Sequence, residues 1–315
     1  MDFSAVPPPD PEIAPQQNQP APGFTSRIFQ NETGIRSGWR ILIYLALALL
    51  FFALAYIPII AVYQPHDANS VGAILTGEAA MFAGAFGAAV AMARIEQRPI
   101  GTYGMPLHSA FAKRFWQGML IGICEISLIV GAMKFFGCYS FGSLSFYGIK
   151  IVEWGLLWIL TAVLIGLQEE FLFRGYMQYT LADGIGFWPS AVVLSVLFGS
   201  VHLLNHGENW VGAANIFFTA LVWAFTLRRT GTLWLAVGWH AAFDFGESFL
   251  YSVPDSGGVF EGHLSNAVVR GPAWLTGGKV GPEASVFAFL TLVLGVVLIH
   301  FWFPAPPKTQ TNTNT

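Results

Sequence analysis

Eight apolar segments, each about 20 residues long, occupy most of the sequence between residues 40 and 303. A helix of about 20 residues spans the hydrocarbon core of a bilayer, because each residue adds about 1.5 Å. The segments cover residues 40–63, 71–93, 115–136, 152–182, 187–206, 209–227, 231–250 and 284–303. They predict an all-α, polytopic integral membrane bundle of about eight transmembrane helices.

The composition excludes two other classes of protein. Only 10% of the residues are charged and 54% are hydrophobic, and the mean hydropathy is +0.56. A soluble domain carries about 25% charged residues, so a soluble enzyme is excluded. The net charge of −3 excludes a basic nucleic-acid binder. The expected partners are therefore the lipid bilayer and a membrane protein or peptide, and no nucleic acid.

Two polar tails flank the apolar region. Residues 1–38 are rich in proline and predict a disordered tail, and residues 304–315 form a second polar tail. Between them we expect N-terminal transmembrane helices over 39–151, a membrane core over 152–250 and a last helix over 284–303. The Gly-rich segment 251–283 is interpreted as an extracytoplasmic loop, with a lid as the alternative.

The distribution of Lys and Arg predicts the orientation. With the N-terminus in the cytoplasm, the cytoplasmic segments hold Arg27, Arg36, Arg40, Arg94, Arg98, Lys113, Arg114, Arg228, Arg229 and Lys308. The outer segments hold only Lys134, Lys150, Arg270 and Lys279. Because cytoplasmic loops are enriched in Lys and Arg, this bias places both termini in the cytoplasm, and the cell membrane is the expected location.

Two adjacent carboxylates interrupt the fourth apolar segment. A charge at this depth costs at least about 2.5–3.5 kcal/mol on insertion scales, so each one requires a physical reason. Glu170 and Arg174 are four residues apart and can form an ion pair on one helix face. Glu169 is rotated away from Arg174 and must face another partner.

Three histidines lie in the fifth and seventh segments. His202 and His206 are one helical turn apart and are expected to share a helix face, and His206 lies at the predicted outer end of its segment. His240 and Asp244 are also one turn apart, and Glu247 continues the same helical stripe. An Asp placed next to a His can fix the tautomer and orientation of the imidazole. Buried polar contacts between helices are the structural alternative.

Two further acidic residues lie in apolar segments. Glu78 is in the second segment and Glu125 is in the third, and neither has a basic partner nearby in the sequence. For both we expect a structural hydrogen bond, with a functional role as the alternative.

The spacing of these residues resembles the three motifs of the CPBP family of intramembrane endopeptidases, which includes the CAAX prenyl protease type 2 and bacterial abortive-infection proteins. The motifs are Glu169-Glu170-x-x-x-Arg174, Phe198-x-x-x-His202 and His240-x-x-x-Asp244. The resemblance covers about residues 152–250.

The resemblance implies an all-helical domain with a water-filled pocket and four catalytic residues. Glu169 would activate a water that His202 helps to hold, while His240 and Asp244 would polarise the scissile carbonyl. A carboxylate in an apolar pocket gains basicity, and donors aimed at the oxyanion supply much of the catalysis. We expect Glu170, Arg174 and Phe198 to support the site structurally. Asn205 and Glu247 belong to the same supporting group.

Asp244 leaves the mechanism open at one point, because an ionised Asp cannot donate a hydrogen bond to an oxyanion. Either Asp244 is protonated, or it only orients His240. A metal-free mechanism is favoured, so no cofactor is expected. The alternative is a zinc ion held by His202, His240, Asp244 and Glu169.

The predicted function is hydrolysis of a peptide bond in a membrane substrate, for which prenylation is an open alternative. A non-catalytic membrane binding or immunity protein is the second interpretation, although the motif set is intact. An ion-coupled transporter is the third, and the lack of an internal repeat argues against it.

Overall fold

The computed structural model describes residues 29–31, 34–64, 67 and 69–304, in two units divided after Arg36. The expected disorder of residues 1–38 and the tail after residue 304 lie largely outside the described residues. In the first unit, β1 (Gln30–Asn31) pairs antiparallel with β2 (Gly34–Ile35).

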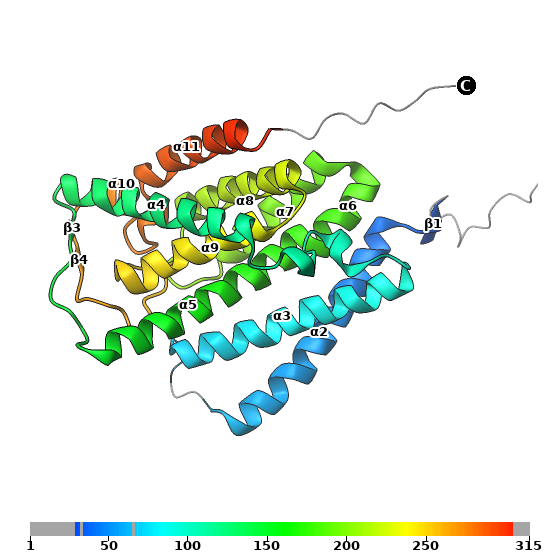
Figure 1. Cartoon of the computed structure of the whole chain (residues 1–315), viewed down its shortest axis with the longest axis horizontal. Coiled ribbons are helices and arrows are strands. Elements are labelled where there is room, and N and C mark those ends of the chain that lie inside the picture. The colour runs from blue at the N-terminus through cyan, green and yellow to red at the C-terminus, as the bar shows by residue number, and fades with distance from the viewer. Residues whose placement is uncertain (1–28, 32–33, 65–66, 68, 305–315) are drawn as a thin grey trace, which may run out of the picture. The chain divides into compact units, whose positions relative to one another are not determined.

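The second unit is almost entirely helical, as Figure 1 shows. Its α-helices are α2 (Ser37–Val62), α3 (Val71–Ile95), α4 (Lys113–Phe135), α5 (Ile149–Glu170), α6 (Met177–Ile185), α7 (Phe187–His202), α8 (Trp210–Thr230), α9 (Trp234–Phe245), α10 (Ala273–Thr276) and α11 (Val286–Trp302). Two π-helices, η3 (Phe171–Tyr176) and η4 (Gly246–Leu250), and three 3-10 turns, η1 (Ile100–Tyr103), η2 (Leu107–Ser109) and η5 (Pro282–Ala284), complete it. The short strands β3 (Tyr139–Ser140) and β4 (Val268–Val269) pair antiparallel.

Each of the eight predicted segments coincides with helical structure. By length and composition, five described helical segments can cross a membrane: α2, α3, α4, the continuous α5–η3–α6 segment and α8. Helices α7 and α11 are apolar but shorter. The fold is therefore the expected all-α membrane bundle.

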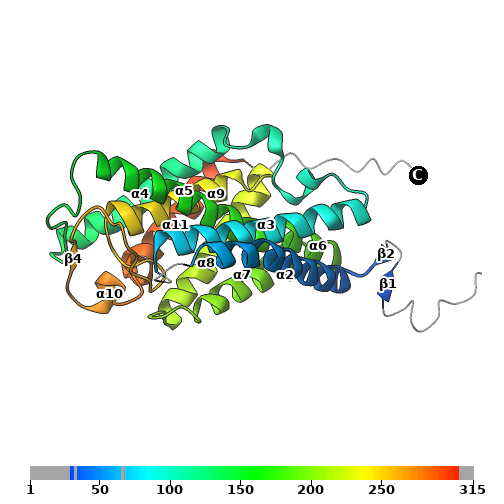
Figure 2. The same ribbon diagram turned by 90° about the horizontal axis from the view of Figure 1, so that it is seen from below.

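Helix α9 lies at the centre of the bundle, between α4 and α5 (Figures 1 and 2). Glycines allow α4 and α9 to approach closely. A Cβ atom on Gly122 would lie 2.2 Å from the carbonyl oxygen of Trp239, and one on Gly238 would lie 2.1 Å from that of Phe115. No other residue fits there, because real Cβ atoms do not approach a backbone oxygen so closely. The main chain that carries His240 therefore packs directly against α4.

The fifth predicted segment differs from the structure at its end. Helix α7 ends at His202, and turns follow in which the amide of Leu203 donates to Ser200 and that of Asn205 donates to His202. Gly207, with φ of 99°, completes the change of direction. The expectation that His202 and His206 share a helix face was therefore wrong, because the chain leaves the helix between them.

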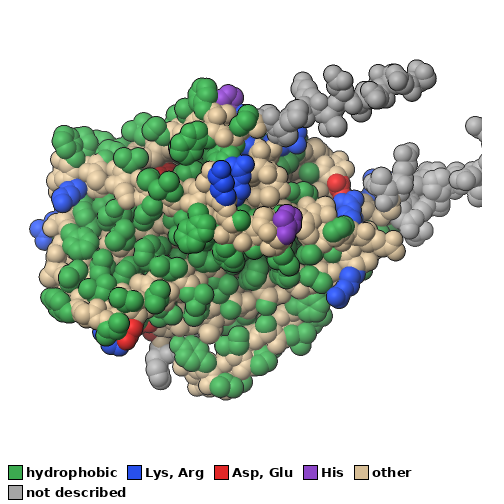
Figure 3. Space-filling model, in the orientation of Figure 1, with side chains coloured by type: hydrophobic (Ala, Val, Ile, Leu, Met, Phe, Trp, Pro, Cys, Tyr) green, Lys and Arg blue, Asp and Glu red, His purple; other side chains and the backbone are tan. Residues whose placement is uncertain are grey.

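The outer surface of the bundle is apolar. Figure 3 shows hydrophobic side chains over most of one face, with few Asp or Glu side chains among them. On α2, Leu49, Leu54 and Ile57 are all at least 60% exposed. Exposed side chains of this kind match a lipid environment, and they confirm an integral membrane protein.

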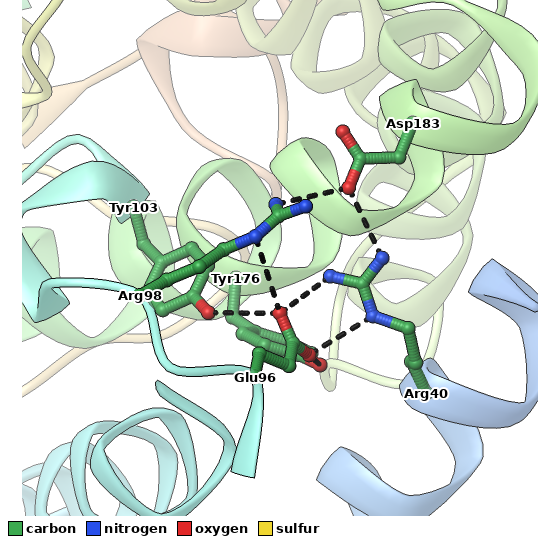
Figure 4. Close-up of polar contacts among 6 residues, drawn as sticks. All are labelled: Arg40, Glu96, Arg98, Tyr103, Tyr176 and Asp183. Atoms are coloured by element: carbon green, nitrogen blue, oxygen red, sulfur yellow. Dashed lines mark hydrogen bonds and ion pairs between the residues drawn. The ribbon is translucent and has the colours of Figure 1, made fainter. Parts of the chain in front are cut away.

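A network of charged and phenolic side chains ties α2, α3 and α6 together at one end of the bundle (Figure 4). Arg40 makes two hydrogen bonds to the carboxylate of Glu96, at 2.9 and 2.5 Å, and reaches Asp183 at 3.0 Å. Arg98 also pairs with Asp183 at 3.0 Å, and the Tyr176 hydroxyl donates to Glu96. We call this end the Arg-rich end.

The opposite end carries the long connector from η4 to α11. Its two halves meet where the amide of Gly257 donates to the carbonyl of Val280 at 2.8 Å. Gly281, with φ of 128°, packs so closely on Pro254 that a Cβ would lie 2.2 Å from the Pro254 carbonyl oxygen. The connector is thus an ordered structure over this end of the bundle.

Candidate active site

The first elements of the site are Glu170 and Arg174, which form the ion pair that their four-residue spacing predicts. Glu170 Oε1 lies 3.0 Å from Arg174 Nη1, and the side chains are 0% and 2% exposed. The guanidinium carbon of Arg174 lies 4.2 Å from the ring centroid of Phe198 and 5.5 Å from that of Trp223. Aromatic faces stabilise a desolvated cation, although Glu170 Oε2 and Arg174 Nη2 are buried without hydrogen-bond partners among the described residues.

Glu169 is in a different environment from its neighbour. Its side chain is 22% exposed, and its Oε2 lies 3.7 Å from His240 Nε2. The chain then changes from α5 into the π-helix η3, in which Gly175 has non-helical backbone angles (φ −82°, ψ −117°). Such π-turns inside α-helices are frequent at functional sites.

His240 is the point where the carboxylates meet. Its Nδ1 lies 3.4 Å from Glu170 Oε1, and its Nε2 lies 3.4 Å from Asp244 Oδ2. The Trp223 ring stacks on the imidazole, with centroids 4.4 Å apart and planes 25° apart. Contacts on both nitrogens and on one ring face fix the orientation of His240.

His202 reaches the site from the end of α7. Its Nδ1 lies 2.8 Å from the carbonyl oxygen of Phe198, which requires Nδ1 to carry the proton. Nε2 of the neutral ring is then an acceptor, free to hold a water. The Phe198 ring packs edge-on against the imidazole of His202, with the ring centroids 4.5 Å apart.

Glu169, His202, His240 and Asp244 line one cavity of about 590 Å³, a volume typical of ligand sites. Its polar lining is Asn69, Glu78, Glu169, His202, Asn205, His206, His240, Asp244, Asp255 and Ser256. Trp158, Ile74, Ile165, Val259 and Phe260 supply apolar walls. The structure therefore brings Glu169, His202, His240 and Asp244 together, although they come from three separate segments.

The other acidic residues of the apolar segments have different positions. Glu78 lines the cavity, and its Oε2 is buried without a hydrogen-bond partner among the described residues. Glu125 accepts a hydrogen bond from Trp239 Nε1 at 2.5 Å, which matches the structural interpretation. Glu247 does not line the cavity, because it lies one turn further, in η4, beside Asp255 and Glu283.

Sequence reasoning missed several residues of the site. Trp223 lies on α8, outside every motif, and only the packing of α8 on α9 places it against His240. Trp158 and the segment Asp255–Phe260 also line the cavity. The one available signal was the turn-forming sequence Asp255-Ser256-Gly257-Gly258 in the connector.

The residues named for a zinc site do not converge on one point. Among the described residues, the group whose three ligand atoms all lie within 4.8 Å of one another is Glu247, Asp255 and Glu283. No three of Glu169, His202, His240 and Asp244 meet that condition. The geometry of these four residues therefore does not fit a zinc ion.

Comparison with known families finds a match over part of the chain. Residues 151–246 match the family model described as "Type II CAAX prenyl endopeptidase Rce1-like". The matched segment runs from α5 to the start of η4 and contains all four candidate catalytic residues. No curated protein and no solved structure matches the chain.

The fold is that of an integral membrane protein, and the family matched over part of the chain is one of endopeptidases. Over residues 151–246 the chain is similar to the Rce1-like type II CAAX prenyl endopeptidases, which matches the resemblance drawn from the three motifs.

Proposed function

We propose that the protein is an intramembrane endopeptidase in which Glu169 activates a water for attack on a peptide bond. The observation that carries this proposal is the unequal environment of the glutamate pair. Glu170 is fully buried against Arg174, whereas Glu169 is part-exposed in the cavity, so Glu169 alone of the two can meet a water.

The proposed steps use only side chains of this chain. Nε2 of His202 holds the water while Glu169 accepts one of its protons and the water oxygen bonds to the carbonyl carbon. When the resulting intermediate collapses, the C–N bond breaks and the proton on Glu169 passes to the leaving amine nitrogen. Protonated His240 donates from Nε2 to the carbonyl oxygen, because Nδ1 is directed to Glu170. Protonated Asp244 would be a second donor. Preorganised hydrogen-bond donors of this kind strongly stabilise the negative charge that develops on the carbonyl oxygen.

The position of the cavity suggests how a substrate enters. Asn69, Asn205 and the segment Asp255–Phe260 all belong to connectors at the end opposite the Arg-rich end. If cytoplasmic loops carry the excess of Lys and Arg, the cavity opens toward the extracytoplasmic side. We propose that the substrate is a membrane-associated protein cleaved near that surface, in the cell membrane.

The test compares membrane proteomes of cells that express the wild type, Glu169→Gln or Glu153→Gln. Glu153 is an exposed carboxylate that pairs with Lys150 on the same helix, so its variant is a matched control. We expect new protein termini with the wild type and Glu153→Gln, and none with Glu169→Gln. Identical termini in all three would contradict the proposal and favour a non-catalytic binding protein.

A further inference from the structure

Two buried carboxylates, Glu247 and Glu283, lie close to the part-buried Asp255 at the junction of η4 and the connector. One oxygen each from Glu247, Asp255 and Glu283 lies within 4.8 Å of the other two. Two oxygens on one calcium ion cannot be further apart than twice the Ca–O distance, about 4.6–5.2 Å. The three oxygens therefore fit the coordination shell of one ion.

Glu247 supplies a second, independent observation. Its side chain is 0% exposed, and neither of its carboxylate oxygens has a hydrogen-bond partner among the described residues. Oε1 of Glu283 is also buried without a partner. A buried charged group without a partner costs several kcal/mol, so these oxygens require a cation or a proton.

No Lys or Arg of the described chain pairs with these carboxylates. Ser248 Oγ donates a hydrogen bond to Asp255 Oδ2 at 2.7 Å, so among the described residues this cluster has a neutral hydrogen-bond donor but no cationic side chain to balance its charge.

We propose that Glu247, Asp255 and Glu283 bind a hard divalent cation, for which Ca²⁺ is the best fit. All-oxygen, carboxylate-rich sets prefer Ca²⁺, Mg²⁺ or Mn²⁺ over zinc, and Ca²⁺ tolerates irregular geometry. The proposed site is distinct from the proteolytic residues and does not depend on the proposed function.

The location gives the ion a structural role. Glu247 belongs to the continuation of α9, whereas Asp255 and Glu283 belong to the two halves of the connector. Gly257 and Val280 already join these halves through a backbone hydrogen bond. Because residues 255–260 also line the cavity, a bound ion would fix one wall of it against the helix that carries His240.

The test uses the full chain in detergent, stripped with a chelator and titrated with Ca²⁺, Mg²⁺, Mn²⁺ or Zn²⁺. We expect Ca²⁺ to raise the Tm by roughly 5 °C at 100-fold excess over its Kd, with one ion bound per chain. Asp255→Asn and Glu283→Gln should each lose at least tenfold in affinity, and Glu153→Gln should retain the full shift.

The titration of the wild type measures ion binding and the shift in Tm even where a variant fails to fold. No bound ion and no shift in Tm with Ca²⁺, Mg²⁺ or Mn²⁺ would overturn the proposal in favour of protonated carboxyls that share hydrogen bonds. An unchanged Ca²⁺ shift in Asp255→Asn and Glu283→Gln would also overturn it, because the ion would then bind elsewhere. Neither result bears on cleavage by Glu169.

Discussion

Glu169 and Glu170 are adjacent in sequence, but the rotation of about 100° between neighbouring helical residues places their side chains in different environments. Glu170 meets the guanidinium of Arg174 and Nδ1 of His240 in a fully buried position. Glu169 faces the cavity and Nε2 of the same histidine. We therefore propose that the Glu170–Arg174 pair has a positioning role and that Glu169 reacts with water.

The first prediction at this scale concerns stability. Arg174→Ala leaves Glu170 as a buried charge without its partner and should lower the free energy of unfolding by about 3–5 kcal/mol. Glu169→Gln should have the wild-type melting temperature, because replacing a part-exposed carboxylate by an amide changes the free energy of unfolding little. Thermal melting in detergent measures both. An early melt of Glu169→Gln with a normal melt of Arg174→Ala would reverse the assignment.

The second prediction concerns Asp244, whose Oδ2 lies 3.4 Å from His240 Nε2. If protonated Asp244 donates to the oxyanion, Asp244→Asn supplies the same donor and should keep most of the activity. Asp244→Ala should lose about 10²–10³-fold in kcat, the usual effect of removing one such donor. Turnover of both variants between pH 5 and 9 is the measurement. A large loss in Asp244→Asn would indicate an ionised residue that orients His240.

At the scale of elements, the close packing of α4 on α9 decides where His240 lies. Gly118, Gly122 and Gly238 allow backbone-to-backbone contact, since a Cβ on any of them would lie about 2 Å from a carbonyl oxygen of the facing helix. The π-helices η3 and η4 then change the helical phase beside the catalytic residues. Together these features fix side chains from separate segments around one cavity.

This packing predicts the effect of a larger residue. Gly122→Val should push α9 away from α4, lower the Tm and reduce activity, because the overlap is with main-chain atoms that cannot move aside. Gly131→Ala in the same helix is the control. A Cβ there meets nothing within 4 Å, so it should raise stability slightly through helix propensity. Equal melting temperatures for the two variants would contradict this account of α4–α9 packing.

At the scale of the whole membrane domain, the two ends of the bundle differ in chemistry. The Arg-rich end is tied together by Arg40, Glu96, Arg98 and Asp183. The other end carries the connector, the cavity lining and the carboxylates of Glu247, Asp255 and Glu283. In the orientation that we propose, with the excess of Lys and Arg on the cytoplasmic side, the proposed proteolytic site and the proposed cation site both lie toward the outside.

Labelling of single cysteines tests that orientation. With Cys124 and Cys138 replaced by Ala, His108→Cys and Arg228→Cys should react only from the cytoplasm. Lys150→Cys and Asn266→Cys should react with an impermeant reagent from outside. All four positions are exposed in the structure. Outside labelling at position 228 would reverse the orientation and place the cavity on the cytoplasmic side.

The sequence by itself determined the membrane class, the helical segments and the Glu170–Arg174 pair. Those features depend on local quantities: the length of an apolar run, and the 3.6-residue period that places positions i and i+4 on one face. Only the tertiary structure decided which polar groups meet across helices. It placed Trp223 on His240, ended α7 before His206, and brought Glu247 to Asp255 and Glu283 rather than into the cavity. Such contacts depend on glycine-mediated packing, π-turns and the path of a long connector, and these are set by interactions between segments distant in sequence.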